Sequence, residues 1–221
     1  MSIDDDGGDV AAGWIDPAVA TEFPQLRLWS LGLGSVGPRR SPPVLRARLR
    51  AMSDRFHGGK AIVLRQQPIP HAYRVFFRHI GLDPDVDRVP VEALVLERLR
   101  HGGFRSTSAL ADAITVAVME TSVPVWALDA SRVSGVLGIR PAVERERLGR
   151  RDDHAPWLPD GRLVVADGEG PVAVLFGDVA PGHAAGDASS AAVLFSVQVA
   201  GVPDIHVSEA LWTVADTLEG L

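Results

Sequence analysis

The sequence contains no cysteine, which excludes disulfide bonds, thiolate metal sites and a thiol nucleophile. It also lacks any apolar run near the roughly 18 residues that a membrane-spanning helix needs. Its first residues, MSIDDDGGDVAAG, have neither the basic region nor the apolar core of a secretory signal. From these absences we expect a cytoplasmic protein that does not enter a membrane.

Basic residues are missing from both ends of the chain. Residues 1–26 contain six acids and residues 163–221 contain eight, in both cases without Lys or Arg. All 22 basic residues lie between positions 27 and 162, beside 14 acids. A basic middle can form a patch for a phosphate backbone, but scattered arginines can equally pair with nearby acids and water. Both interpretations stay open at this point.

The common catalytic and cofactor signatures are also missing. There is no G-x-S-x-G nucleophile motif and no Walker loop. Residues 32–37 fit G-x-G-x-x-G, but prolines follow where a dinucleotide fold needs a helix, so this glycine run is interpreted as a turn. The seven histidines show no zinc-site spacing. We therefore expect no cofactor and no metal.

Start and stop signals divide the chain into helices followed mostly by strands. Proline, serine and glycine punctuation predicts helices over about residues 42–56, 70–80, 91–100, 108–120 and 208–218. Short apolar runs predict strands at 61–64, 125–128, 136–140, 163–166, 172–176 and 191–199. Residues 143–162 form the predicted long loop, and residues 1–12 a disordered tail. Helices in the first half and strands in the second indicate an α+β fold.

The stretch from residue 112 to residue 142, DAITVAVMETSVPVWALDASRVSGVLGIRPA, carries the most specific pattern. It resembles, without a gap, the editing module in the beta chain of bacterial phenylalanyl-tRNA synthetase, which is built from that chain's third and fourth B modules. The matching positions are Asp112, Glu120, Pro124, Ala127, Asp129, Arg132, Gly135, Arg140 and Ala142. Upstream, HAYRVFFR at 71–78 and RVPVEAL at 88–94 resemble the front of stand-alone editing-module proteins. The resemblance covers about residues 60–200.

This resemblance implies the architecture and the activity. It implies mixed sheets in a sandwich-like arrangement with helices packed outside, in a single domain over residues 13–221. The implied activity is hydrolysis of the ester of a mischarged aminoacyl-tRNA by a freestanding trans-editing factor. An activated ester needs only a pocket that orients one water and stabilises the developing oxyanion, so no strong base is required. The implied partner is tRNA; the resemblance identifies neither the catalytic residue nor the oligomeric state.

Candidate site residues follow from the positions that match the family. The substrate pocket is predicted to include Thr115, Glu120, Trp126, Asp129, Phe176 and Asp178. The candidates for contact with tRNA are Arg74, Arg78 and Arg88. Structural roles are weighed against these: Asp129 can fix a turn, Glu120 can be a surface acid, and Arg88 can pair with Glu92 along a helix.

The departures from the family pattern bear on specificity. Trp126 stands where the synthetase module has a pocket histidine, and Thr115 stands where it usually has asparagine. A double-glycine turn followed by glutamate appears here only as Phe176-Gly177-Asp178. We therefore do not expect clearing of tyrosine. Trp126 either narrows the pocket for a smaller substrate or packs in the core.

The substituted pocket positions also leave a second function open. The alternative is a module of the same fold that binds tRNA or a free amino acid without catalysis. A third, weaker possibility is an interaction domain that no longer binds RNA. The amino acid and tRNA that an active enzyme would clear are not identifiable from the residues alone.

Overall fold

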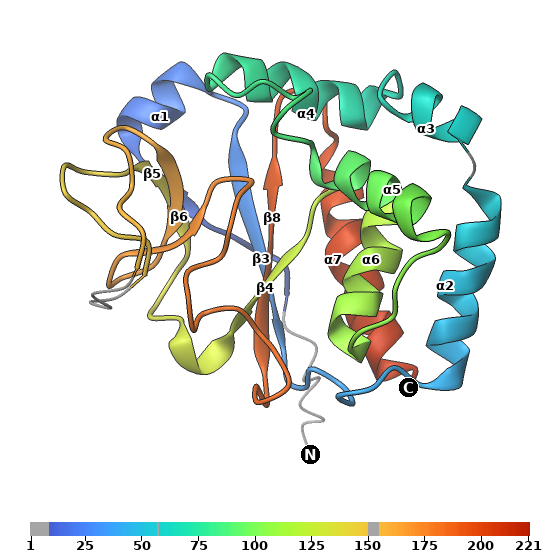
Figure 1. The fold of residues 1–221 in the computed structure, drawn as a ribbon. Helices are drawn as coiled ribbons and strands as arrows, with labels where there is room; N and C mark the ends of the chain where they lie inside the picture. The colour runs from blue at the N-terminus through green and yellow to red at the C-terminus, as the bar shows by residue number, and fades with distance from the viewer. Residues whose placement is uncertain (1–8, 57, 150–154) are drawn as a thin grey trace. The chain divides into compact units, whose positions relative to one another are not determined.

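The structure is a computed structural model that describes residues 9–56, 58–149 and 155–221. Its contacts divide the chain into two compact units (Figure 1). The sheet unit comprises Met1–Val36 and Trp126–Gln198, and the helical unit comprises Gly37–Val125 and Val199–Leu221. Each unit is therefore assembled from two separate stretches of sequence.

The sheet unit contains two four-stranded sheets. The first has the order β1 (Ala11–Ala12), β3 (Arg27–Leu33), β8 (Ala192–Gln198) and β4 (Trp126–Asp129), and all its pairs are antiparallel. The second has the order β2 (Trp14–Ile15), β5 (Gly138–Pro141), β6 (Leu163–Ala166) and β7 (Pro171–Val174). Its β2–β5 pair is parallel and its other pairs are antiparallel. The short helices α1 (Pro17–Glu22) and η1 (Ala130–Arg132) complete the unit.

Strand β3 lies in the middle of the first sheet, and it is not among the strands predicted above. It pairs with β8 over seven residues, from Arg27 opposite Gln198 to Leu33 opposite Ala192. Leu28 and Leu31 are both almost completely buried, yet an odd spacing places them on opposite faces of the strand. A strand buried on both faces lacks the alternation of apolar and polar residues that identifies a half-exposed strand.

Two glycines allow the two sheets to meet. The amide of Gly13 donates to the carbonyl of Leu28 in β3 at 2.8 Å, and a Cβ at Gly13 would lie 2.4 Å from the carbonyl oxygen of Leu137. Trp14, the next residue, belongs to the second sheet, where a Cβ at Gly138 would lie 2.1 Å from its indole ring. The chain can pass from one sheet to the other only because these positions have no side chain.

The helical unit is formed by α2 (Pro43–Arg55), α3 (Gly58–Leu64), α4 (Pro68–His79), α5 (Pro90–His101), α6 (Ala109–Thr121) and α7 (Asp204–Glu219). Proline occupies the first turn of α2, α4 and α5, where its missing N–H costs nothing. Gly102 ends α5 with a left-handed φ of 74°, and the side chain of Ser108 caps α6. The structure confirms all five predicted helices, and four of them begin and end within about two residues of the predicted bounds.

Two local predictions are wrong. The residues expected to form a strand at 61–64 belong to α3, because four apolar residues do not distinguish a strand from a helix and the elements around them are helices. Ser208 does not cap the last helix, since α7 already begins at Asp204 after Pro203. The predicted tail over residues 1–12 lies mostly outside the described residues, but Ala11 and Ala12 form β1.

The strand predictions in the second half are confirmed to within a few residues, as is the long connection between β5 and β6. Arg140, at the end of β5, forms a bidentate ion pair with Glu146 at 2.6 and 2.8 Å. Hydrogen bonds from Arg140 hold the pKa of the Glu146 carboxyl below its usual range. The chain is α+β with mixed sheets in a sandwich-like arrangement, as predicted. The single domain over residues 13–221 stays a prediction, and no described helix is long and apolar enough to cross a membrane.

We expect Gly138→Ala to lower the free energy of unfolding by about 1–3 kcal/mol, because the added methyl group collides with the Trp14 indole. Gly32→Ala is the matched control, since nothing lies within 4 Å of a Cβ at that strand position. Denaturant unfolding of both variants measures the difference. Equal stabilities would show that the packing of Trp14 on Gly138 does not constrain the sheets.

Candidate functional site

Trp126 lies in an aromatic cluster of the sheet unit. Its ring stacks on Phe195 of β8 with centroids 5.4 Å apart and meets Phe176 edge-on at 5.8 Å. Phe195 faces Trp126 across the antiparallel β4–β8 pair, and Trp126 itself is half-buried. Stacked and edge-on aromatic pairs add stability beyond their buried area. Packing therefore accounts for at least two sides of the indole.

The turn after β7 holds Phe176 in this cluster. Phe176 has a φ of 58°, a left-handed backbone that is uncommon for an aromatic residue. Two backbone bonds close the turn, from Gly177 to the carbonyl of Val174 and from Val174 to the carbonyl of Asp178, both at 2.9 Å. A Cβ at Gly177 would lie 3.0 Å from Val174, so this glycine is needed where the turn is tightest. The Asp178 side chain is exposed beyond it.

Asp129 ends β4 and fastens the loops beside it. One carboxylate oxygen accepts from the amide and hydroxyl of Ser131 at 2.9 and 2.6 Å, and the other accepts from the hydroxyl of Ser189 at 2.6 Å. These hydrogen bonds, with that from the Ser131 hydroxyl the largest, lower the pKa of Asp129. The carboxylate thus anchors η1 and the loop before β8. This agrees with the turn-fixing role that the sequence left open for Asp129.

Thr115 lines a pocket in the helical unit, here called the α5–α6 pocket. Its volume is about 200 Å³, and it is lined by Leu94, Glu97, Arg98, His101, Gly103, Phe104, Arg105 and Thr115. The Thr115 hydroxyl donates to the carbonyl of Ala111 one turn earlier at 2.9 Å, so its oxygen can still accept a hydrogen bond. This is the one predicted pocket residue that lines either of the described cavities among the helices.

Glu120 is a surface acid. Both of its carboxylate oxygens lie 2.9 Å from a guanidinium nitrogen of Arg48, which reaches it from α2. Both side chains are about two-fifths exposed, so solvent weakens the attraction between them. Glu120 does not line either of the described pockets, and its ion pair with Arg48 connects α2 with α6.

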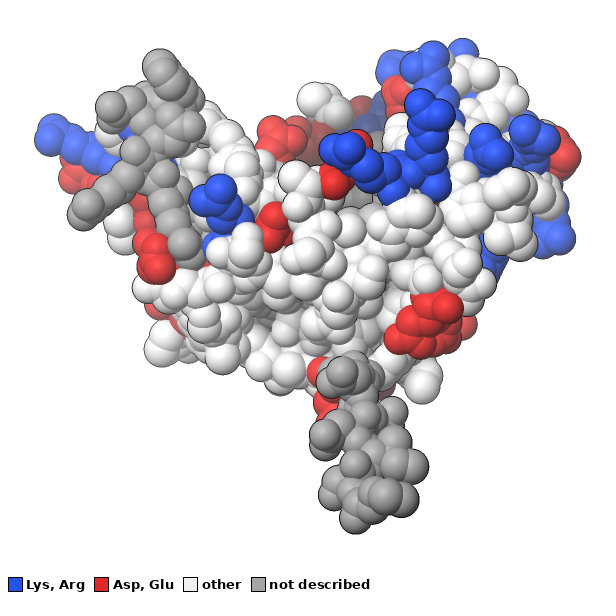
Figure 2. Space-filling model, turned by 90° about the horizontal axis from the view of Figure 1, so that it is seen from below, with Lys and Arg blue, Asp and Glu red and all other residues white. Residues whose placement is uncertain are grey.

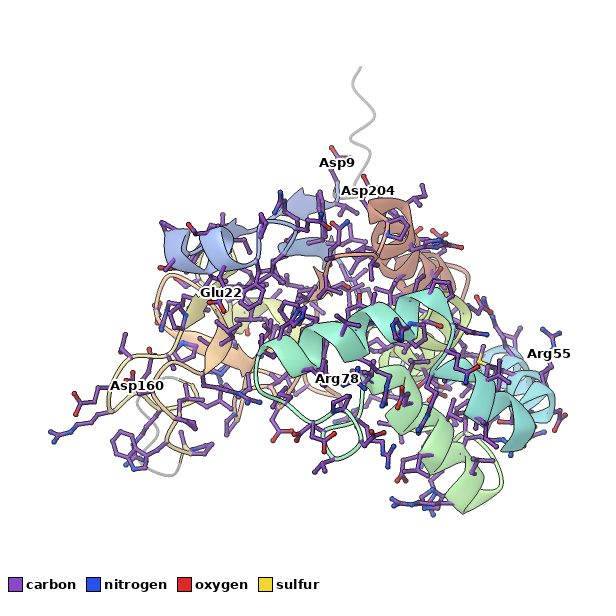
Figure 3. The ribbon with its side chains drawn as sticks, turned by 90° about the horizontal axis from the view of Figure 1, so that it is seen from above. Asp9, Glu22, Arg55, Arg78, Asp160 and Asp204 are labelled. Atoms are coloured by element: carbon purple, nitrogen blue, oxygen red, sulfur yellow. The ribbon has the colours of Figure 1, made fainter. Side chains whose placement is uncertain are left out.

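The three arginines predicted to contact tRNA differ sharply in exposure. Arg74 is buried and donates to Glu92 at 3.0 Å and to Asp85 at 2.8 Å. Burial alone would lower the pKa of Arg74, but the hydrogen bonds and charges of these two acids raise it. The guanidinium of Arg74 is therefore engaged by acids inside the fold. Arg78 is exposed on α4, where Figure 3 labels it, and Arg88 is half-buried at the rim of a second pocket.

The predicted site residues thus fall into separate groups. Trp126 and Phe176 come together in the sheet unit, whereas Thr115 and Glu120 belong to the helical unit. Residues not predicted for the site complete both groups: Phe195 in the aromatic cluster, and Arg98, Phe104 and Arg105 in the α5–α6 pocket. Phe195 was visible only as one apolar residue of a predicted strand. The pocket arginines carried a weak signal, since basic residues gather at the end of α5.

The chain is an α+β module. Among the described residues, no group of three or more His, Asp or Glu side chains could hold a metal ion. A sequence model of the B3/4 domain family matches residues 72–208. Because this match covers more than half of the chain, the chain belongs to the B3/4 domain family.

Curated relatives of this chain are beta subunits of phenylalanine–tRNA ligase. The one from Streptomyces avermitilis is 35% identical over 92 residues, which cover 42% of this chain and 11% of the relative. The one from Legionella pneumophila strain Lens is 35% identical over 78 residues, covering 35% and 10%. The one from Neisseria gonorrhoeae is 38% identical over 74 residues, covering 34% and 9%. The chain spans about a tenth of the length of these relatives, and it is a synthetase-related module.

We expect Arg74→Gln to lower the free energy of unfolding by about 3–5 kcal/mol, because it leaves the buried Glu92 carboxylate without its partner. Arg78→Gln, on the exposed side of the same helix, should change stability by no more than about 0.5 kcal/mol. Denaturant unfolding separates the two. If Arg74→Gln is as stable as Arg78→Gln, the buried ion pair does not hold the helical unit together.

We expect Trp126→Ala to cost about 3 kcal/mol of stability through the space left between Phe176 and Phe195. The control is Trp157→Ala, because Trp157 is 59% exposed and only covers the guanidinium of Arg147. Thermal unfolding of both variants gives the comparison. A melting temperature for Trp126→Ala equal to that of Trp157→Ala would rule out a packing role for the indole.

Proposed function

We propose that this chain hydrolyses the ester bond of a mischarged aminoacyl-tRNA, acting in trans on tRNA charged by a separate synthetase. The observation that carries the proposal is membership of the B3/4 domain family together with similarity to beta subunits of phenylalanine–tRNA ligase. Those relatives are named for a tRNA ligase, so tRNA is the partner that their similarity suggests. The activity is thus the editing reaction that the sequence resemblance implies.

The chemistry asks little of the protein. An aminoacyl ester is already activated, so holding the ester beside one oriented water accounts for much of the required acceleration. The Thr115 oxygen lines a cationic pocket and can accept a hydrogen bond from such a water. Arg98 and Arg105 line the same pocket and supply positive charge where an oxyanion or a phosphate would lie.

Selectivity in this proposal comes from apolar packing rather than from polar recognition. Trp126 replaces the histidine of the family pattern and packs against two phenylalanines. Asp178, at the position compared with a glutamate, has a shorter side chain on an exposed turn. Neither residue offers a tyrosine hydroxyl the hydrogen bonds of the family pattern, so a smaller or less polar amino acid is the proposed substrate.

The proposal treats residues 13–221 as one functional domain that works in the cytoplasm. The family match supports this, because residues 72–208 run from the helical unit through the sheet unit and back into the helical unit. Neither unit alone contains the matched sequence.

A non-catalytic tRNA- or amino-acid-binding module is the second candidate. It is favoured because both candidate carboxylates are already bonded within the protein. Asp129 accepts three hydrogen bonds, and Glu120 is paired with Arg48. Neither is positioned as a free general base. Under this alternative the protein binds tRNA in a salt-dependent manner and leaves the ester intact.

A deacylation screen tests the proposal. Purified protein is incubated with correctly and wrongly charged tRNAs, and the loss of labelled amino acid is followed against an enzyme-free control. We expect one mischarged species to be cleared, and Thr115→Val to slow its clearance about tenfold, the value of one hydrogen bond of about 1.4 kcal/mol.

The matched control for that variant is Thr21→Val. Thr21 is exposed in the sheet unit and makes the same bond to the carbonyl one helical turn earlier, so its loss should leave the rate unchanged. Folded protein that clears no species across a broad panel would overturn the deacylase and favour the binding module.

A further inference from the structure

We propose that the α5–α6 pocket receives one base of single-stranded RNA, with the neighbouring phosphates held by arginines of α2 and of the α5–α6 segment. This inference rests on the proposed function, from which it takes RNA as the ligand of the chain, and it concerns the same pocket that Thr115 lines. It adds a specific contact site, part of which lies on a helix outside the family-matched residues 72–208.

The pocket is held in shape by one residue of α2. The carbonyl of Ser53 accepts from Nε and Nη2 of Arg98 at 3.2 and 2.8 Å, and the Ser53 hydroxyl accepts from the amide of Phe104 at 2.9 Å. Ser53 is only 6% exposed, so these bonds are shielded from water. The guanidinium of Arg98 and the backbone of Phe104 are consequently held before any ligand arrives, which reduces the entropy lost on binding.

The charge that faces the pocket is positive. Among the described residues, Nη1 of Arg98 and the guanidinium of Arg105 have no hydrogen-bond partner, and both arginines line the cavity. The one acid in the lining, Glu97, lies 2.9 Å from Arg100 and 3.2 Å from His101. Its charge is therefore offset by Arg100. These arginine N–H groups without an acceptor favour an anionic group at the mouth of the pocket.

The walls and the volume indicate what enters. Leu94 and Phe104 give the pocket apolar surfaces suited to a flat, weakly polar group. The cavity of about 200 Å³ is smaller than the roughly 300 Å³ at which enclosed small-molecule sites begin. It therefore holds one part of a larger ligand whose remainder lies outside. A nucleobase with its sugar and phosphates outside has this form, and bases commonly pack on aromatic side chains in single-strand recognition.

Exposed arginines also lie on α2, the helix whose Ser53 holds Arg98 and Phe104. Arg46 and Arg50 are exposed on the flank of this helix that carries Ser53, whereas Arg55 lies about 200° round the helix from Ser53. The described residues supply none of the three with an ion-pair partner. Figure 2 shows Lys and Arg side chains gathered towards the side of α2 and α5, and Figure 3 shows Arg55 at the outer edge of these helices. Favourable interaction with the helix dipole does not explain Arg46, which lies in the first turn, where a positive charge is unfavourable.

The combination selects single-stranded RNA over a duplex. In a duplex the bases are stacked and paired, so none is available to enter a pocket, whereas its phosphates alone could still contact the arginines. A single strand offers both a free base and phosphates at its sides. Because a single strand can use both the pocket and the arginines, we expect it to bind more tightly than a duplex.

The test uses the full chain and a fluorescein-labelled hexanucleotide of single-stranded RNA, followed by fluorescence anisotropy over a series of salt concentrations. We expect Phe104→Leu to weaken binding about tenfold through lost stacking. Arg105→Gln should reduce the slope of log affinity against log salt by about 0.7, the value for one phosphate contact on a single strand. Arg132→Gln removes one exposed positive charge from the sheet unit and should leave both quantities unchanged.

Each outcome decides the inference. Circular dichroism confirms folding of each variant; should Phe104→Leu unfold, the exposed Arg105→Gln decides alone. Wild-type affinity and salt slope in the folded variants would overturn the site, as would equal weakening by Arg132→Gln. Deacylation is measured on the same preparations. If the wild-type protein hydrolyses the ester and the pocket variants bind RNA normally, the deacylase proposal holds and this site is wrong. If the pocket variants bind RNA more weakly and the wild-type protein hydrolyses no ester, the site is supported and the deacylase proposal is wrong.

Discussion

The helical unit depends on the buried carboxylate of Asp112. It is 1% exposed and accepts hydrogen bonds from the hydroxyls of Ser41 and Ser106 and from the amide of Thr107. A buried carboxylate is costly unless its oxygens are bonded, so these three donors must stay in place together. They belong to the residues just before α2 and just before α6, which fixes where both helices begin. With Ser53 holding the other end of α2 against α5, the walls of the α5–α6 pocket are set from both ends.

The acidic side chains at the resemblance positions are used to build the fold. Asp112 organises helix starts, Asp129 fastens loops and Glu120 ties α6 to α2. The buried Glu92 neutralises Arg74 in the same way. What is left for a ligand is a set of arginines, a threonine hydroxyl and aromatic faces. The function proposed above uses such side chains to bind and orient an anionic substrate, in a reaction where positioning contributes more than proton transfer.

The sequence predicted helices where proline and glycine give local signals, as at Pro90 and Gly102 around α5. It failed for β3, because a strand buried on both faces has no alternation, and for α3, because a short apolar run suits either structure. At the candidate site, residue types were predictable but their partners were not. The ion pair between Arg74 and Glu92 and the stacking of Trp126 on Phe195 each join two separate elements, so no local sequence pattern predicts either contact.

The interleaving of the two units has a consequence for how the chain reaches its fold. Strand β3 pairs with β8, which follows it by about 160 residues, so the centre of the first sheet cannot form until β8 is present. Helix α6 likewise packs against α7 from the C-terminal stretch. Closing such long loops costs chain entropy before the contacts repay it, which slows folding. During synthesis the apolar faces of β3 and α6 emerge well before their partners. Proteolytic dissection would also be uninformative, because no single cut releases either unit with its full set of elements.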